Sequence, residues 1–169
     1  MRFKFCPICK NDLKEIKGNT SCDKCGYIKY VDVVTCVSFL PIKDGKVLLA
    51  IRKNEPYKSE LDQLGGFLEP NETAEEGAIR EAKEETGADI KIIKLLGTYP
   101  DKYGASGVYT LNIQYLVEIE ENVKANDDVL DLVWVEIKDI PNLKFNGFKN
   151  TKETLNDLYK DYIGRGAEN

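Results

Sequence analysis

The chain of 169 residues contains no histidine, one methionine and one tryptophan. Without histidine, nucleophilic catalysis by a Ser-His or Cys-His pair is excluded, and so is an imidazole general base. Proton transfer near neutral pH must then rely on carboxylates, lysine, tyrosine or a water bound to a metal ion. The absence of one residue type therefore narrows the acid–base chemistry before any motif is considered.

Long hydrophobic runs are also missing. No stretch approaches the roughly eighteen apolar residues of a membrane span, and the start, MRFKFCPICK, lacks the apolar segment of a secretory signal. We therefore expect a cytoplasmic protein with no membrane partner. An apolar share of 42% is enough for the core of one domain of ordinary size.

Charge is unevenly distributed along the chain, whose net charge is −5. Residues 1–30 hold seven Lys or Arg and three Asp or Glu, whereas the remainder holds seventeen and twenty-six. The acidic remainder argues against sequence-independent nucleic-acid binding. The basic N-terminal piece leaves a local phosphate contact open.

Four cysteines of this N-terminal piece form two CxxC pairs twelve residues apart, namely Cys6, Cys9, Cys22 and Cys25. They supply four soft ligands for a tetrahedral Zn²⁺ ion, and no open position remains, so the predicted site is structural. Two disulfides are the alternative, but a cytoplasmic location disfavours them. A redox CxxC does not normally occur as a matched pair. The spacing resembles the two knuckles of a zinc ribbon.

The stretch 66–88, GFLEPNETAEEGAIREAKEETGA, predicts a glycine turn followed by a helix. Thr73 and Glu76 form a capping-box pattern, so the helix should begin directly after Thr73. Gly87 supplies the stop, because glycine adopts the left-handed conformation without strain. Small residues that would let the helix lie close against a sheet follow at helical spacing: Ala74, Ala78 and Ala82.

Three carboxylates lie on one side of this predicted helix. Glu81, Glu84 and Glu85 fall within about a third of its circumference, where like charges repel. A helix that keeps them usually has a compensating cation, and carboxylates suit Mg²⁺ or Mn²⁺. Arg80 lies beside the cluster, and Glu72 can reach back to hold its guanidinium. The alternative is a solvated acidic helix.

The complete pattern resembles the Nudix box, the signature of the Nudix hydrolase family. Its glycine, glutamate and arginine positions are filled by Gly66, Glu72, Arg80, Glu81, Glu84, Glu85 and Gly87. Ala82 and Ala88 stand where a bulky aliphatic residue is frequent, a departure that touches packing. The resemblance covers about residues 31–162. It implies a mixed α/β (α+β) fold, with a mixed sheet sandwiched between helices. We expect a zinc ribbon over 1–30 and a Nudix domain over 31–169.

The remaining elements follow from local patterns. β-branched residues and turn signals predict a hairpin over 31–53 and strands over 89–99, 109–120 and 132–137. The segments between them, 54–65, 100–107 and 121–131, are expected to be loops. Helical spacing of apolar residues predicts a closing helix over 150–162.

The resemblance also implies a role for each site residue. Glu81 and Glu85 would be the principal Mg²⁺ or Mn²⁺ ligands, and Glu84 would complete a second site. The carbonyl of Gly65 would join the metal shell. Arg80 and Glu72 would orient the loop and the helix.

The general base has two candidates in this resemblance. Relatives draw it from the helix, here Glu81, or from an acidic residue six positions before a tryptophan, here Asp128 before Trp134. Asp127 lies beside Asp128, and a solvated loop is the alternative for both. The implied reaction is hydrolysis of the pyrophosphate in a nucleoside diphosphate linked to another group.

The sequence specifies the substrate less closely than the reaction. A zinc ribbon before a Nudix domain resembles the NADH pyrophosphatase family, but the motif SQPWPFPxS of that family is absent from residues 97–104. ADP-ribose or a related dinucleotide is as favoured as NADH, and capped RNA is the one nucleic-acid substrate considered. Tyr99 and Tyr103 are candidates to stack a base, with packing as the alternative.

Other functions stay open at this point. A Nudix domain can also be a non-catalytic nucleotide-binding regulator, but such domains often lose glutamates that this chain keeps. A pyrophosphatase of oxidised nucleoside triphosphates is a second alternative. An isoprenoid diphosphate isomerase on the same fold lacks the matching Cys and His elements. Many Nudix proteins are homodimers, which makes a homodimer an expectation here.

Overall fold

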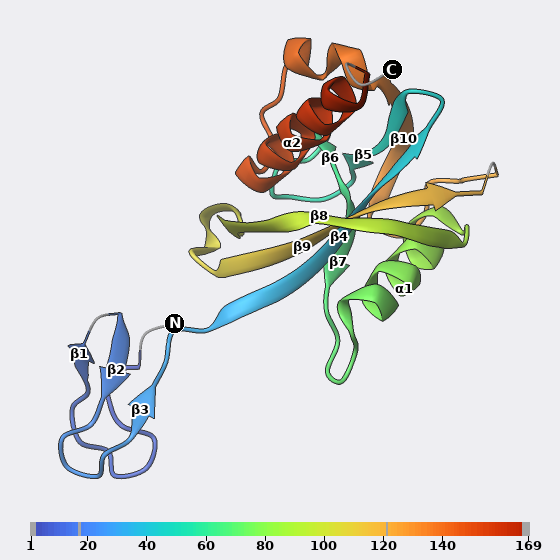
Figure 1. Ribbon diagram of the computed structural model, residues 1–169. Helices are drawn as coiled ribbons and strands as arrows, with labels where there is room; N and C mark the ends of the chain where they lie inside the picture. Colours follow the sequence, from blue (N-terminus) through green and yellow to red (C-terminus); the bar gives the residue numbers. More distant parts are fainter. Residues whose placement is uncertain (1–2, 17, 121, 167–169) are drawn as a thin grey trace. The chain divides into compact units, whose positions relative to one another are not determined.

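The computed structural model describes residues 3–16, 18–120 and 122–166 (Figure 1). The chain divides into two compact units, with the boundary after Val33. Within the described ranges, no helix is both long and apolar enough to cross a membrane.

Unit 1, the N-terminal unit, is a small antiparallel sheet in the order β1-β2-β3. Its strands are β1 (Lys14–Ile16), β2 (Asn19–Ser21) and β3 (Ile28–Lys29). Cys6 and Cys22 are its only buried residues among those described. Each CxxC pair is followed by a residue of positive φ, Lys10 or Gly26, whose N–H donates to Cys6 or Cys22. Unit 1 therefore has almost no apolar core.

Unit 2 is built on a seven-stranded mixed sheet. Its strands are β4 (Val33–Lys43), β5 (Lys46–Arg52), β6 (Leu61–Asp62), β7 (Leu64–Phe67), β8 (Ile90–Lys102), β9 (Tyr109–Ile119) and β10 (Val129–Glu136). The order is β10-β5-β4-β9-β8, with β6 paired to β5 and β7 paired to β4. The predicted hairpin is the antiparallel pair β4–β5.

The sheet lies between two helices, α1 (Ala74–Thr86) and α2 (Lys149–Gly166), on opposite faces (Figure 1). Alternation along β4 produces the two faces, because Val37 and Phe39 pack on the α1 side and Leu40 on the α2 side. The predicted small-residue stripe lets α1 approach closely, and Ala78 and Ala82 are fully buried. The predicted fold, a mixed sheet between helices, is confirmed.

Three segments depart from the sequence prediction. The predicted loop 54–65 contains β6 and the start of β7, and β10 begins three residues earlier than the predicted strand 132–137. Strand β8 continues through Pro100 to Lys102, where a loop is predicted. Because β8 is at the end of the strand order, the proline is tolerated there without loss of a central ladder bond.

Candidate active site

Helix α1 has both predicted end signals. The Thr73 hydroxyl oxygen accepts from the N–H of Glu76, and the Glu76 carboxylate accepts from the N–H of Thr73, which completes the capping box. Gly87 ends the helix at φ 70° and donates to the carbonyl of Lys83. These ends fix which residues of the box share one face.

Arg80 connects most of the box glutamates. Its guanidinium holds Glu72 through two hydrogen bonds, Nε to Oε1 at 2.8 Å and Nη2 to Oε2 at 3.0 Å. Its Nη1 donates to Glu81 Oε1 at 2.7 Å and to Glu84 Oε2 at 3.0 Å. The predicted Glu72–Arg80 contact is therefore confirmed, and one cation serves three carboxylates.

Glu81 lies directly against Gly66 of the glycine turn. A Cβ added at Gly66 would stand 2.4 Å from Glu81 Oε1, closer than any van der Waals contact allows. Burial raises the pKa of Glu81, and Arg80 partly opposes that shift. Glycine at position 66 thus makes room for a buried carboxylate.

Glu85 is the most buried carboxylate of the box. Its Oε2 accepts a hydrogen bond from the N–H of Gly65 at 2.8 Å. Burial raises the pKa of Glu85 well above its usual range, the Gly65 bond opposes this, and the charges of Glu81, Asp62 and Asp127 add to it. Gly65 itself is at φ 132°, and a Cβ there would lie 2.2 Å from the carbonyl oxygen of Val37. Only glycine fits that position.

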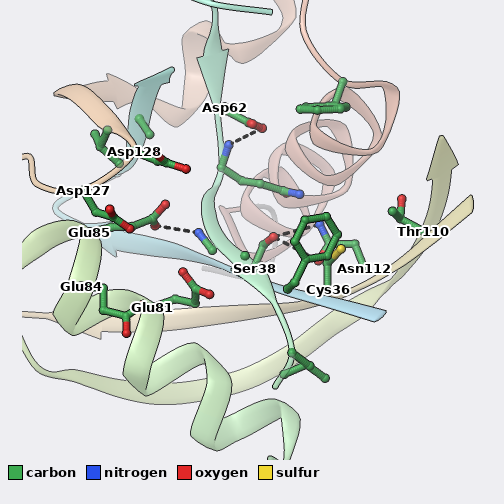
Figure 2. Close-up of a pocket in the computed structure, with 18 of the residues that line it drawn as sticks. Cys36, Ser38, Asp62, Glu81, Glu84, Glu85, Thr110, Asn112, Asp127 and Asp128 are labelled. Atoms are coloured by element: carbon green, nitrogen blue, oxygen red, sulfur yellow. Dashed lines mark hydrogen bonds between the residues drawn. The ribbon is translucent and has the colours of Figure 1, made fainter. Parts of the chain in front are cut away.

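The loop before β10 brings two aspartates to the same place. The N–H of Asn126 donates to the Glu85 carbonyl at 2.9 Å, which ties the loop to the end of α1. Asp128 accepts from Asn54 Nδ2 at 2.6 Å, whereas the charge of Asp127 raises the pKa of both Glu81 and Glu85. Figure 2 shows Asp127 beside Glu85, with Asp128 directed toward the same cluster. The structure adds Asp127 to the candidate bases.

This acidic cluster fits a divalent cation. The described residues provide it with one cation, Arg80, which is already shared among Glu72, Glu81 and Glu84. No ion pair of the described residues involves Glu85. Burial also disfavours the charged form of Glu85, so no protein cation compensates that cost. Clustered hard oxygen donors that lack positive charge suit Mg²⁺ or Mn²⁺. The donor set is therefore chemically consistent with the predicted metal.

A cavity of about 470 Å³ adjoins the cluster. Its size is within the usual range for small-molecule sites. Figure 2 shows the acidic residues on one side and Ser38, Asn112 and Thr110 on the other. Ser38 and Asn112 hydrogen bond to each other in the buried interior. The cavity thus has an acidic end and a neutral polar end.

An aromatic group lines the cavity wall. The ring centroids of Phe67 and Tyr103 are 5.5 Å apart, as are those of Tyr103 and Phe148. Tyr99 does not line the cavity; it is buried and donates to Asp157 of α2 at 3.2 Å. Of the two tyrosines proposed to stack a base, only Tyr103 is therefore placed for it.

Two further lining residues, the half-buried Arg52 and the buried Asp62, form an ion pair that the sequence did not predict. Arg52 Nη1 donates to Asp62 Oδ2 at 2.7 Å, and the Thr151 hydroxyl donates to Asp62 Oδ1 at 2.6 Å. The Arg52 guanidinium also lies over the Phe148 ring at 5.0 Å. Opposite charges ten residues apart on different strands carry no local pattern that would reveal this pair.

The four cysteines of unit 1 converge as predicted. Their sulfur atoms lie within 4.8 Å of one another. Burial raises the pKa of Cys22, but the N–H groups of Cys25 and Lys24 outweigh it and lower the pKa to about 7. The Tyr27 N–H lowers the pKa of Cys25, but partial desolvation and hydrogen bonds with the three other thiols raise it to about 12. Four thiolates need a cation to coexist, which fits Zn²⁺.

Fold and site together define a domain in which an acidic helix on a mixed sheet faces a cavity of ligand size. The model of the NUDIX domain matches residues 29–158. The chain therefore belongs to the Nudix family, as its box indicates.

Individual relatives agree with this assignment. The chain is 34% identical over 130 residues to an ADP-ribose pyrophosphatase of Methanocaldococcus jannaschii, covering 76% of this chain and 77% of that protein. It is 28% identical to the NAD-capped RNA hydrolase NudC of Vibrio atlanticus, covering 83% of this chain and 52% of that protein. The chain thus spans about half the length of that relative.

A solved structure resembles most of the chain. The Nudix hydrolase of Nitrosomonas europaea superimposes with a TM-score of 0.74 at 25% identity, covering 96% of this chain and 93% of the other.

Proposed function

We propose that this protein is a pyrophosphohydrolase that depends on Mg²⁺ or Mn²⁺ and cleaves a nucleoside diphosphate linked to a second group. ADP-ribose, NADH and related dinucleotides are the preferred substrate class. The observation that carries the proposal is the juxtaposition of the acidic cluster with a cavity whose far end is neutral and polar. In a dinucleotide-type substrate a charged pyrophosphate adjoins an uncharged nucleoside, which matches the acidic end and the neutral end of the cavity.

Each site residue has a role in this reaction. Glu81, Glu84 and Glu85 would hold the divalent cation, assisted by the Gly65 carbonyl. The bound cation offsets the charge that develops on the pyrophosphate during attack by water. Arg80 and Glu72 position the helix and the turn, since their hydrogen bonds fasten Glu81 and Glu84 in place.

The proton of the attacking water would pass to a carboxylate. Glu81, Asp128 and Asp127 are the candidates, because all three line the cavity beside the proposed cation site. In unit 1, Cys6, Cys9, Cys22 and Cys25 would hold a structural Zn²⁺, because their sulfur atoms are grouped at ligand spacing.

The test is product analysis by mass spectrometry. The full chain is incubated with Mg²⁺ or Mn²⁺ and, separately, with ADP-ribose, NADH, NAD-capped RNA, a nucleotide sugar and an oxidised nucleoside triphosphate. We expect cleavage at the pyrophosphate of a dinucleotide-type compound, well above cleavage of the triphosphate.

The variant Glu85→Gln keeps the side-chain volume but removes a ligand charge. We expect its turnover to fall by at least about 100-fold, a loss typical for removal of a group that stabilises transition-state charge. Glu118→Gln is the matched control, since Glu118 is exposed and pairs with Lys91 on the sheet edge. Near-normal turnover of Glu85→Gln would contradict the proposed metal role. Binding without any cleavage would favour the regulatory alternative.

A further inference from the structure

Asn54 is a polar residue of the cavity that the proposed reaction leaves without a role. It follows the end of β5 by two positions and lines the cavity. Its Nδ2 donates to Asp128 Oδ1 at 2.6 Å, and in the described part of the chain no other side chain donates to this candidate base. The two residues are 74 positions apart, so it is the fold that brings the amide to the carboxylate.

Strand pairing fixes the backbone on both sides of this bond. β5 and β10 are antiparallel with Arg52 opposite Val129, so the residues that follow β5 lie beside those that precede β10. The N–H of Lys53 donates to the carbonyl of Asp128 at 3.0 Å and extends the ladder by one bond. The bond from Asn54 therefore orients a side chain on a backbone that is already held.

The three candidate bases differ in how their carboxylates are held. Glu81 is bound by the cation Arg80 and is also a proposed metal ligand, so its oxygens are already engaged. Asp127 makes no side-chain hydrogen bond within the described ranges, so no contact sets the direction of its carboxylate. Asp128 has one oxygen fixed by a neutral amide, which leaves Oδ2 to take a proton from a set direction. Of the three, Asp128 alone is oriented without being neutralised.

We propose that Asn54 is a positioning residue whose amide orients Asp128 so that Oδ2 accepts the proton of the attacking water. In that step the O–H bond of the water breaks, its oxygen bonds to phosphorus, and the bridging P–O bond breaks. The proton goes to Asp128, and the electron pair of the broken P–O bond stays with the released phosphate. The inference deepens the proposed function and rests on it. Proton transfer depends on the distance and direction from the base, so this bond acts on the chemical step.

The experiment measures steady-state kinetics of Asn54→Ala with Mg²⁺ and ADP-ribose, or with NADH should NADH be cleaved faster. We expect kcat to fall by about 10-fold and KM to change by less than about 2-fold, because the base is misoriented while substrate contacts stay. Asn54→Asp keeps the size of the side chain but replaces the donor with a carboxylate that repels Asp128, so it should lower kcat at least as far.

A double-mutant cycle with Asp128→Ala separates positioning from a structural role. Asp128→Ala alone should lower kcat by about 100-fold or more, the usual contribution of a general base. In that background Asn54→Ala should change kcat by less than about 2-fold, because no carboxylate is left to orient. A structural effect of Asn54 would persist there as a second, independent loss.

Asn156→Ala is the matched control. Asn156 is exposed on α2 and does not line the cavity. Its variant should keep the kcat and the KM of the wild-type protein. The thermal midpoint of each variant, measured on the full chain, verifies that all of them are folded.

The other outcomes would overturn the inference. A rise in KM of Asn54→Ala with unchanged kcat would identify a substrate contact in place of a positioning role. Wild-type kcat in Asn54→Ala, near-normal turnover of Asp128→Ala, or equal losses with and without Asp128 would also overturn the inference, and each would leave the hydrolase intact. Cleavage of no compound by the wild-type protein would overturn the proposed function and this inference together.

Discussion

Unit 1 and unit 2 differ in what holds their acidic groups together. In unit 1, four thiols face one another in a piece with two buried residues among those described. In unit 2, the carboxylates are placed by a sheet with an apolar core on each face, and they border an open cavity. The first arrangement has almost no apolar core to hold it together, whereas the second has a core on each face of its sheet.

This difference separates two uses of a metal. A closed set of four soft ligands leaves no position for a substrate, so its ion contributes to stability. A set of hard ligands beside a cavity leaves ligand positions open, so its ion contributes to chemistry. The comparison would fail if a variant in the thiol cluster changed activity but not stability. It would also fail if a variant in the carboxylate cluster changed stability but not activity.

The largest expected effect is the loss of unit 1 in Cys22→Ser. We expect loss of zinc by elemental analysis and collapse of the amide signals of unit 1 in NMR spectra of the full chain, because little else stabilises that unit. The signals of unit 2 should persist. Cys36→Ser is the control, since Cys36 lies outside the cysteine cluster. Full retention of zinc by Cys22→Ser would show that the cluster is not the metal site.

A smaller effect is expected for Arg80→Lys. Lysine keeps the charge but cannot reproduce the paired bonds to Glu72 together with those to Glu81 and Glu84. Loss of this positioning should lower kcat/KM by about 10-fold or more, with little change in the thermal midpoint. Lys91→Met, which removes an exposed cation on β8, should change neither quantity. A large drop in stability of Arg80→Lys with unchanged kcat would show that Arg80 stabilises the fold and does not position the glutamates for the reaction.

The smallest effects come from two glycines of the box. Gly66→Ala crowds the Glu81 carboxylate, so we expect activity to fall while stability changes little. Gly87 is at φ 70° with open space around it, so Gly87→Ala should cost about 1 kcal/mol of unfolding free energy and leave kcat unchanged. Steady-state kinetics and denaturant unfolding of both variants test whether the first loses activity and the second loses stability. Equal losses of activity in the two variants would contradict the prediction.

Local signals account for what the sequence predicted well. Thr73 and Gly87 mark the ends of α1 through contacts within a few residues, and the box spacing places Glu81, Glu84 and Glu85 on one face. The roles of these residues remain predictions. The contact between Arg80 and Glu84 follows from helix geometry, because the two residues are four positions apart.

Long-range contacts explain what the sequence did not predict. The Ser38–Asn112 pair joins residues 74 positions apart, and no local pattern marks either one. Tyr99 illustrates the same limit, because only the docking of α2 decides whether it faces the cavity or the helix. Strands β6 and β7 are too short for a periodic signal and form because partners on β5 and β4 are available.

Two backbone bonds at the end of α1 have a consequence for ligand binding. Lys124 and Asn126 donate to the carbonyls of Thr86 and Glu85, so the aspartate loop is closed onto the helix during folding. The conformational entropy of that loop is lost at this stage and not when a ligand arrives. A charged ligand therefore meets carboxylates from both segments that are already ordered, and its affinity is not reduced by the cost of assembling them.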